Sequence, residues 1–263
     1  MATLVLFHAH PDDEAVATAG VMVRAAQRGH RVVLVVATRG ERGEVPDGFL
    51  SPGERLADRR TAETEAAAAL LGVARVEFLG YEDSGMMGEP GNQAPESFWQ
   101  ADVEEAARRL AAILEEERPD VLTIYDSNGS YGHPDHIQVH RVGVRAAELA
   151  RVEQVYESTI NRDEIATMVR DAADLGIDLD DSGSEVDTSA LGVPATELTT
   201  RVDVREHLDL KRAAMRAHAS QISETSFFLA LPDESFARAF GSEWFIHRGV
   251  ALPVDRFETE LLP

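Results

Sequence analysis

Cysteine is absent from the 263-residue chain, and its absence limits the chemistry the protein can use. Without cysteine there are no disulfides and no thiolate zinc sites, so a metal ion has to be held by His, Asp, Glu or water. Apolar residues make up 44% of the chain, an ordinary share for a globular protein. We therefore expect a sizeable core that needs no covalent staples.

Positive charge is also scarce. The chain has 25 Lys and Arg against 47 Asp and Glu, a formal net charge of −22, and Lys211 is the only lysine. This balance disfavours nucleic acid as a partner, because neutralising phosphates requires clustered Lys and Arg. Anionic membrane surfaces are disfavoured for the same reason.

Long hydrophobic runs are missing as well. No stretch approaches the roughly 20 apolar residues of a membrane-spanning helix. The N-terminus has neither the basic segment nor the apolar segment of a signal peptide. We therefore expect a cytoplasmic protein without a membrane partner, of unknown oligomeric state.

Short apolar runs alternate with segments of helical periodicity along most of the chain. The predicted strands are 3–10, 31–38, 74–81, 120–126 and, more weakly, 153–159; the predicted helices are 12–30, 54–73, 102–120, 133–150 and 204–222. Apolar strands separated by helices indicate a parallel sheet covered on both faces. The predicted fold is a single α/β domain over 1–263, with a Rossmann-like parallel sheet flanked by helices.

The alternation weakens at about 161–195, where the chain is acidic and partly rich in Gly and Ser. We favour a solvated surface insertion here. The functional alternative is a mobile lid over the site.

Two polar stretches carry the residues best suited to chemistry. "HAHPDDE" (8–14) follows the first predicted strand, and "DSNGSYGHPDH" (126–136) follows the fourth. Sheets of this kind bind ligands beyond the carboxyl ends of their strands, so both stretches belong at the same edge.

His10, Asp13 and His136 form the predicted metal site. Two histidines and one carboxylate are an open ligand set that leaves a position for water, which zinc commonly uses in catalysis. Ferrous iron suits the same set. A single His-Pro-Asp-Asp motif is weak, because aspartate often caps a helix; two matching motifs at one edge are a strong signal.

The neighbours of these ligands have predicted roles in catalysis. Asp12 could accept a proton from the metal-bound water. His133 could act as an acid or stabilise developing negative charge, and Asp135 could orient it and favour its charged form. His8 is predicted to be a buried strand residue, and His140 to lie behind the ligands or on a helix surface.

A resemblance to a known family rests on these residues. "AHPDDE" together with "GHPDH" resembles the LmbE-like or PIG-L family of zinc-dependent de-N-acetylases. "TRGERGE" (38–44), "EDSGMMG" (82–88) and "KRAAMRAHASQI" (211–222) are similar to the mycothiol-pathway branch. That branch contains the N-acetylglucosaminyl-inositol deacetylase and the mycothiol S-conjugate amidase.

The resemblance implies a role for each matching residue. It implies zinc ligands at His10, Asp13 and His136, a general base at Asp12, an oxyanion-stabilising or proton-donating histidine at His133 with Asp135 as its partner, a tyrosine reaching the tetrahedral intermediate at Tyr131, and sugar contacts at Arg60 and Asp83.

The predicted function is removal of an N-acyl (acetyl) group from an amino-sugar-type small molecule by zinc-activated water. The first alternative is a C–N hydrolase similar to the mycothiol S-conjugate amidase, which would cleave a thiol conjugate. The second is a non-catalytic metal-binding or nucleotide-binding Rossmann-like protein. Against nucleotide binding, the first strand is not followed by a G-x-G-x-x-G motif.

Overall fold

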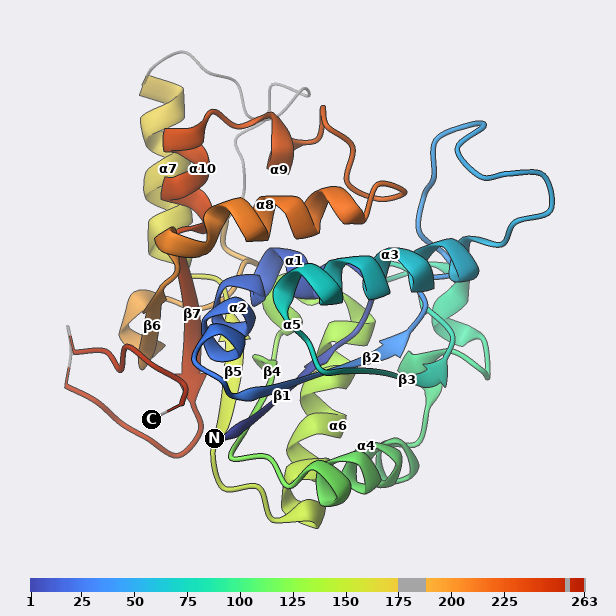
Figure 1. Cartoon of the computed structure of the whole chain (residues 1–263), viewed down its shortest axis with the longest axis horizontal. Helices are drawn as coiled ribbons and strands as arrows, with labels where there is room; N and C mark the ends of the chain where they lie inside the picture. The colour runs from blue at the N-terminus through green and yellow to red at the C-terminus, as the bar shows by residue number, and fades with distance from the viewer. Residues whose placement is uncertain (175–187, 254–255, 263) are drawn as a thin grey trace.

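Seven strands form one sheet in the computed structural model, which describes residues 1–174, 188–253 and 256–262 (Figure 1). The strand order is β3-β2-β1-β4-β5-β7-β6. The strands are β1 (Thr3–His8), β2 (Arg31–Thr38), β3 (Arg75–Tyr81), β4 (Val121–Tyr125), β5 (Val155–Thr159), β6 (Thr200–Asp203) and β7 (Ser242–His247).

The five predicted strands form the parallel part of this sheet. β1 pairs with β2 and β4, β2 with β3, and β4 with β5, all in parallel. β7 runs antiparallel to both β5 and β6, and neither β6 nor β7 was expected from the sequence. The predicted α/β fold is therefore confirmed, with a mostly parallel sheet.

Helices cover both faces of the sheet. α1 (Asp13–Ala17), α2 (Ala19–Gln27), α3 (Leu56–Leu71) and α8 (Leu208–Ala217) lie on one face, and α4 (Val103–Glu117) and α6 (Pro134–Ala150) on the other (Figure 1). The remaining helices are α5 (Gly129–Gly132), α7 (Arg162–Asp174), α9 (Phe227–Ala230) and α10 (Asp233–Phe240). Short 3₁₀ turns occupy Pro90–Gln93, Phe98–Gln100, Ala195–Glu197 and Arg205–His207.

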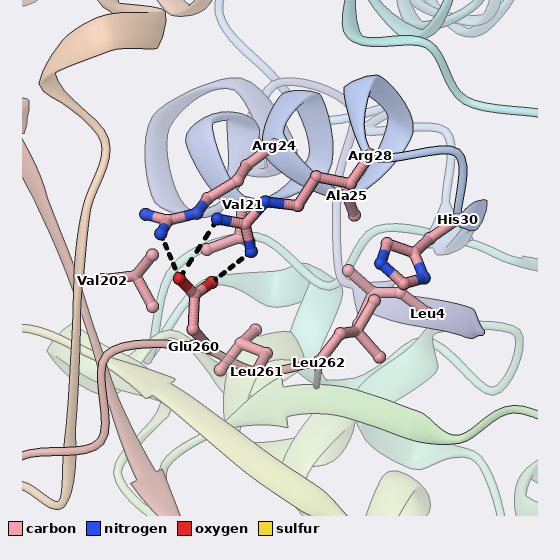
Figure 2. A pocket seen from close by; sticks show the side chains of 10 residues that line it. All are labelled: Leu4, Val21, Arg24, Ala25, Arg28, His30, Val202, Glu260, Leu261 and Leu262. Carbon is pink, nitrogen blue, oxygen red and sulfur yellow. Dashed lines mark hydrogen bonds and ion pairs between the residues drawn. The ribbon is translucent and has the colours of Figure 1, made fainter. Parts of the chain in front are cut away.

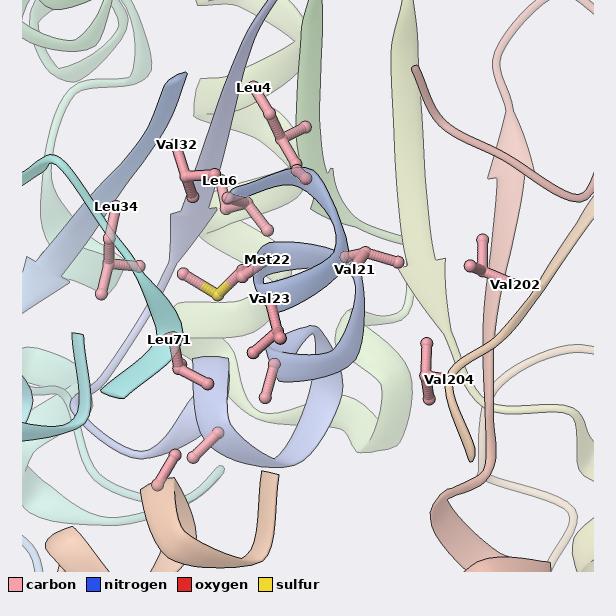
Figure 3. Close-up of a cluster of buried hydrophobic side chains, with 14 of the residues drawn as sticks. Leu4, Leu6, Val21, Met22, Val23, Val32, Leu34, Leu71, Val202 and Val204 are labelled. Atoms are coloured by element: carbon pink, nitrogen blue, oxygen red, sulfur yellow. The ribbon is translucent and has the colours of Figure 1, made fainter. Parts of the chain in front are cut away.

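Alternate residues of the central strand serve two separate cores. Leu4 and Leu6 of β1 pack with Met22 of α2 (Figure 3). Val5 and Phe7 pack toward α4 and α6 on the opposite face. Each fully buried side chain of this size stabilises the fold by about 1.5–3 kcal/mol. The two cores hold β1 rigidly from both sides, and β1 leads directly into the first polar stretch.

The predicted helix 12–30 is in fact two helices. The chain breaks at Thr18, whose φ is −137°. The Thr18 hydroxyl lies 2.8 Å from His8 Nε2. The Glu243 carboxylate accepts hydrogen bonds from the Gly20 and Val21 amides, at 2.7 and 2.8 Å. A carboxylate from β7 thus satisfies the start of α2, and a continuous helix was the wrong prediction.

The predicted insertion at about 161–195 is described only in part. It begins with α7, which was not predicted, and residues 175–187 lie outside the described residues. Beyond them, Ala190 O accepts from Asn128 Nδ2 at 3.0 Å, and the Gly192 amide donates to Ser130 O. The returning part of the insertion therefore lies against the polar stretch after β4. The surface and lid interpretations both stay predictions.

The C-terminal segment packs near the amino ends of the parallel strands, beside the start of β1. Glu260 hydrogen-bonds Arg24 and Arg28 of α2, beside a small pocket that Leu4 at the start of β1 also lines (Figure 2). These side chains are far from the carboxyl end of β1, so the contact holds the C-terminal segment in place and does not contribute to the polar stretches that follow β1 and β4.

Among the described helices, none has the length and apolar character to cross a membrane.

Candidate active site

The two polar stretches, 8–14 and 126–136, meet where the order of the strands in the sheet reverses. From β1 the chain builds the sheet outward through β2 and β3, and then returns to place β4 on the other side of β1. Such a reversal opens a crevice beyond the carboxyl ends of the two central strands. His10 lies just after β1, and His133 and His136 follow β4 through α5.

The three predicted metal ligands lie together. Asp13 Oδ2 is 3.6 Å from His10 Nδ1, and Asp13 Oδ1 is 3.4 Å from His136 Nε2. Two atoms that each lie about 2.1 Å from one tetrahedral ion are about 3.4 Å apart, and each of these two spacings is close to that value. His10 and His136 are 7% and 2% exposed, and His136 Nδ1 is buried without a hydrogen-bond partner.

Other potential ligands surround the same point. His10, His133 and His136 offer ligand atoms within 4.8 Å of one another, and so do His10, Asp83 and Asp135. This buried group of histidines and aspartates could hold a metal ion. His10 belongs to both sets, so the orientation of its ring decides which atoms face the ion.

Hydrogen bonding orients His10 toward Asp13. Its Nε2 lies 3.1 Å from Asp135 Oδ2, which leaves Nδ1 facing Asp13. A carboxylate that accepts a proton from the second ring nitrogen is the usual companion of a metal-ligating histidine. This orientation places Asp135 behind His10, and the ligand set of His10, Asp13 and His136 stays a prediction.

Carboxylates also change the ionisation of His10. Burial lowers its pKa, but the hydrogen bonds with Asp13, Asp135 and Asp83 outweigh burial and raise this pKa well above its ordinary value. A metal ion would have to displace that proton, because a ligand imidazole is neutral.

Asp135 does not pair with His133 as predicted. Its carboxylate is taken by His10 and by Ser84, which donates to it through both its amide and its hydroxyl. His133 Nδ1 instead accepts from the Asp135 amide at 3.1 Å, which caps the start of α6. Burial and the nearby charges of His10 and His136 lower the pKa of His133 to about 4. The expectation of a charged His133 is therefore wrong.

Asp12 differs from the helix cap that its position suggests. Its side chain makes no capping hydrogen bond, although Asp12 stands directly before α1. Burial raises the pKa of its carboxyl to about 6, against the opposing charge of Arg60. Burial acts on Asp13 in the same direction, but His136 and His10 hold the pKa of Asp13 well below its ordinary value. Environments that push the pKa values of two acids apart also separate their chemical roles.

Arg60 lies behind Asp12. It is only 3% exposed, and its Nη2 is 3.4 Å from Asp12 Oδ2. The same guanidinium donates to Gly40 O at 2.8 Å and to Pro11 O. A Cβ on Gly40 would lie 2.0 Å from Arg60 Nη1, so the glycine makes room for the arginine. Arg60 thus supports the predicted base, and its predicted sugar contact stays a prediction.

Replacing Arg60 with methionine is expected to shift the acidic limb of the kcat/KM pH profile upward. The Arg60 charge lowers the pKa of Asp12. Its removal raises that pKa, by about 1 unit or more. If Asp12 must be ionised to act, activity is then lost at a higher pH than in the wild type. The matched control is Arg59→Met, because Arg59 on the same helix pairs with Glu54 instead. An unshifted limb in Arg60→Met would separate Arg60 from the base.

Tyr131 and Asp83 border the predicted metal ligands. The Tyr131 hydroxyl is 3.3 Å from His136 Nε2, and the residue is 41% exposed, so it reaches from the ligands to solvent. Asp83 Oδ1 is 3.5 Å from His10 Nε2 and accepts from the Gly85 amide. Asp83 is 5% exposed, and its predicted sugar contact stays a prediction.

Comparisons with known proteins agree with this geometry. The family model described as GlcNAc-PI de-N-acetylase, PIG-L, matches residues 5–147. The 1D-myo-inositol 2-acetamido-2-deoxy-alpha-D-glucopyranoside deacetylase of Acidothermus cellulolyticus is 44% identical over 95% of this chain and 90% of its own length. The enzyme of the same name from Geodermatophilus obscurus is 39% identical, over 98% and 96%.

A solved structure agrees as well. The N,N'-diacetylchitobiose deacetylase from Pyrococcus horikoshii has a TM-score of 0.60 and 26% identity, over 94% of this chain and 83% of that one. The chain belongs to the PIG-L family. The predicted family and enzyme class, an N-deacetylase that hydrolyses a non-peptide C–N bond, are confirmed.

Two supports of this PIG-L family site were not expected from the sequence. The Tyr125 ring stacks on the His136 imidazole, with centroids 4.4 Å apart and planes at 8°. Its hydroxyl lies 2.6 Å from Nδ1 of His8, which is 1% exposed, as expected of a buried strand residue. The other support is Ser84, which fixes Asp135. Its place in "EDSGMMG" was the only signal that could have found it.

Proposed function

We propose that the chain removes the N-acetyl group from an N-acetylglucosaminyl-inositol substrate, with one zinc ion at His10, Asp13 and His136. The observation that carries the proposal is the Asp12 carboxylate, which stands next to the predicted ligand Asp13 and whose pKa burial raises to about 6. The names of the relatives from Acidothermus cellulolyticus and Geodermatophilus obscurus support the choice of substrate.

The donor atoms fit zinc. Two imidazoles and one carboxylate leave a position for water, and a purely structural site would be closed by a fourth protein ligand. A bound zinc ion would polarise the acetamide carbonyl and lower the pKa of a water molecule from 15.7 toward about 7. Ferrous iron suits the same donors, so the identity of the metal is part of the proposal.

Asp12 acts as the general base. Its carboxyl, with a pKa of about 6, is mostly ionised at neutral pH and accepts the proton of the attacking water. The side chain is 23% exposed, so a substrate can reach it. Arg60 stabilises the ionised form from behind.

His133 and Tyr131 stabilise the oxyanion. His133 Nδ1 accepts a hydrogen bond from the Asp135 amide, so the neutral ring carries its proton on Nε2. That Nε2–H group can donate a hydrogen bond to the oxyanion. The Tyr131 hydroxyl supplies a second donor beside His136. Because a neutral imidazole is a poor acid, the proton for the leaving amine comes from Asp12, which took it from water.

The alternative functions and the predicted location and partners bear on this proposal in different ways. The amidase alternative uses the same residues and differs only in the pocket, so it is an outcome of the assay. The non-catalytic alternatives are set aside, since the matching family model is described as a de-N-acetylase and the relatives are named deacetylases. The cytoplasmic location, the absence of nucleic-acid and membrane partners and the unknown oligomeric state stay predictions.

The test is a deacetylation assay on metal-free protein reloaded with Zn²⁺ or Fe²⁺. The substrates are N-acetylglucosaminyl-inositol, N-acetylglucosamine, diacetylchitobiose and a mycothiol S-conjugate, and the freed amine is measured. We expect the highest kcat/KM with the inositol glycoside and no turnover after chelation. Preference for the thiol conjugate would make the chain an amidase, and full activity without metal would overturn the site.

A further inference from the structure

We propose that Glu14 is a positioning residue which, held by His218, fixes the backbone of Asp12 in the conformation that presents its carboxylate. The inference rests on the proposed function, in which Asp12 is the base, and it adds two residues with no role so far.

Asp12 has an unfavourable backbone conformation. Its φ is 101° and its ψ is −29°. A residue with a side chain adopts positive φ at a cost in free energy, and such residues persist only where their surroundings hold them in place. The contacts of this peptide unit therefore decide where the carboxylate points.

Glu14 binds the amide of Asp12. The Asp12 N–H donates to Glu14 Oε2 at 3.1 Å. Glu14 is 0% exposed, so its carboxylate cannot swing out to water. The Pro11 carbonyl, which belongs to the same peptide group as the Asp12 N–H, accepts from Arg60. The peptide group that precedes the Cα of Asp12 is thus held by two buried charged side chains, at its N–H by Glu14 and at its C=O by Arg60.

His218 holds Glu14. Its Nε2 lies 2.5 Å from Glu14 Oε1, and His218 is 0% exposed. It stands at the C-terminal end of α8, where its carbonyl accepts from the amides of Gln221 and Ile222. An anchor from a distant, well-packed helix leaves Glu14 little freedom, so the Asp12 peptide has little freedom either.

A second buried ion pair on the same helix provides a matched comparison. Lys211 Nζ lies 2.6 Å from Glu243 Oε1, and both residues are at most 3% exposed. Glu243 also accepts from backbone amides, those of Gly20 and Val21, but it does not touch Asp12. Breaking the Lys211–Glu243 pair removes a buried charge interaction of the same kind and does not change the contacts of Asp12.

The experiment compares Glu14→Gln, His218→Leu and His218→Gln with Glu243→Gln. Glutamine at position 14 offers one acceptor in place of two, so it cannot accept from both Asp12 and His218. Leucine at 218 removes the donor, whereas glutamine at 218 can still present an N–H where the histidine has Nε2.

The first readout does not depend on activity. In metal-free protein, hydrogen exchange of the Asp12 amide should be at least about 10-fold faster in Glu14→Gln and His218→Leu than in the wild type or Glu243→Gln. The bound metal per chain should not change, because Glu14 is not a ligand.

The second readout is turnover on the deacetylase substrate. Glu14→Gln and His218→Leu should lower kcat by about 10–100-fold, the usual effect of losing a partner behind a site, and leave KM within about 3-fold. His218→Gln should recover part of the loss. Glu243→Gln should lower the melting temperature without lowering kcat.

Each result decides one way. Unchanged exchange of the Asp12 amide, or an equal fall of kcat in Glu243→Gln, would overturn the positioning role. If Glu14→Gln does not fold, His218→Leu and His218→Gln still test it. A wild-type protein that deacetylates nothing would refute the proposed function, while amide exchange would still decide whether Glu14 holds Asp12.

Discussion

Asp12→Asn is expected to lower kcat by at least about 10²-fold, while the protein keeps one metal ion per chain. Removing a general base typically costs this much or more. Metal is retained because His10, Asp13 and His136 are untouched and Asp12 is not among them. Metal content by atomic spectroscopy and turnover of the acetylated substrate are measured on the same sample.

Asparagine separates the chemistry of Asp12 from its backbone strain. Asparagine adopts positive φ more readily than most residues, so the turn before α1 is preserved and only the base is lost. Asp12→Ala loses the base and adds strain, and its melting temperature should be the lower of the two. If Asp12→Asn lost both metal and activity, Asp12 would be a ligand, and the assignments of Asp12 and Asp13 would have to be exchanged.

The parallel part of the fold could be predicted because its signal is local. Each strand from β1 to β4 is an apolar run, and each following helix has its own periodicity. β7 could not be recognised in this way. Its inward-facing residues are Glu243, Phe245 and His247, and two of these three are ionisable. Lys211 neutralises Glu243 and Glu258 binds His247, but a contact between distant residues leaves no trace in the pattern of a strand.

The same distinction applies to the site. The motifs predicted that His10, Asp13 and His136 come together, since strand ends that share a sheet edge bring their residues together, and the structure places them close to one another. The side-chain hydrogen bonds among the residues of the site could not be predicted from the motifs. Asp135 stands beside His133 in sequence, and proximity suggested that the two interact through their side chains. The start of α6 turns the Asp135 carboxylate toward His10 and Ser84 and leaves His133 only its amide. Direction within a helical turn, rather than spacing along the chain, decides such pairings.

His133→Ala is expected to keep its metal ion and a near-normal KM but to lose about 10²–10³-fold in kcat, as for the removal of one oxyanion donor. An unchanged KM with a lower kcat is the signature of an interaction made mainly in the transition state. The neutral ring that the structure supports predicts this loss as well as a charged one would, because Nε2 still carries a proton.

The alanine variant alone would be ambiguous, because His133 also caps α6 through Nδ1. His133→Asn resolves this. The Asn side-chain oxygen lies near the place of Nδ1 and is a preferred N-cap acceptor, so the helix start is kept and only the donor at Nε2 is lost. We expect His133→Asn to melt close to the wild type and to be as slow as His133→Ala. An asparagine variant with wild-type turnover would make His133 a helix cap and remove it from the reaction, and loss of metal in either variant would make it a ligand.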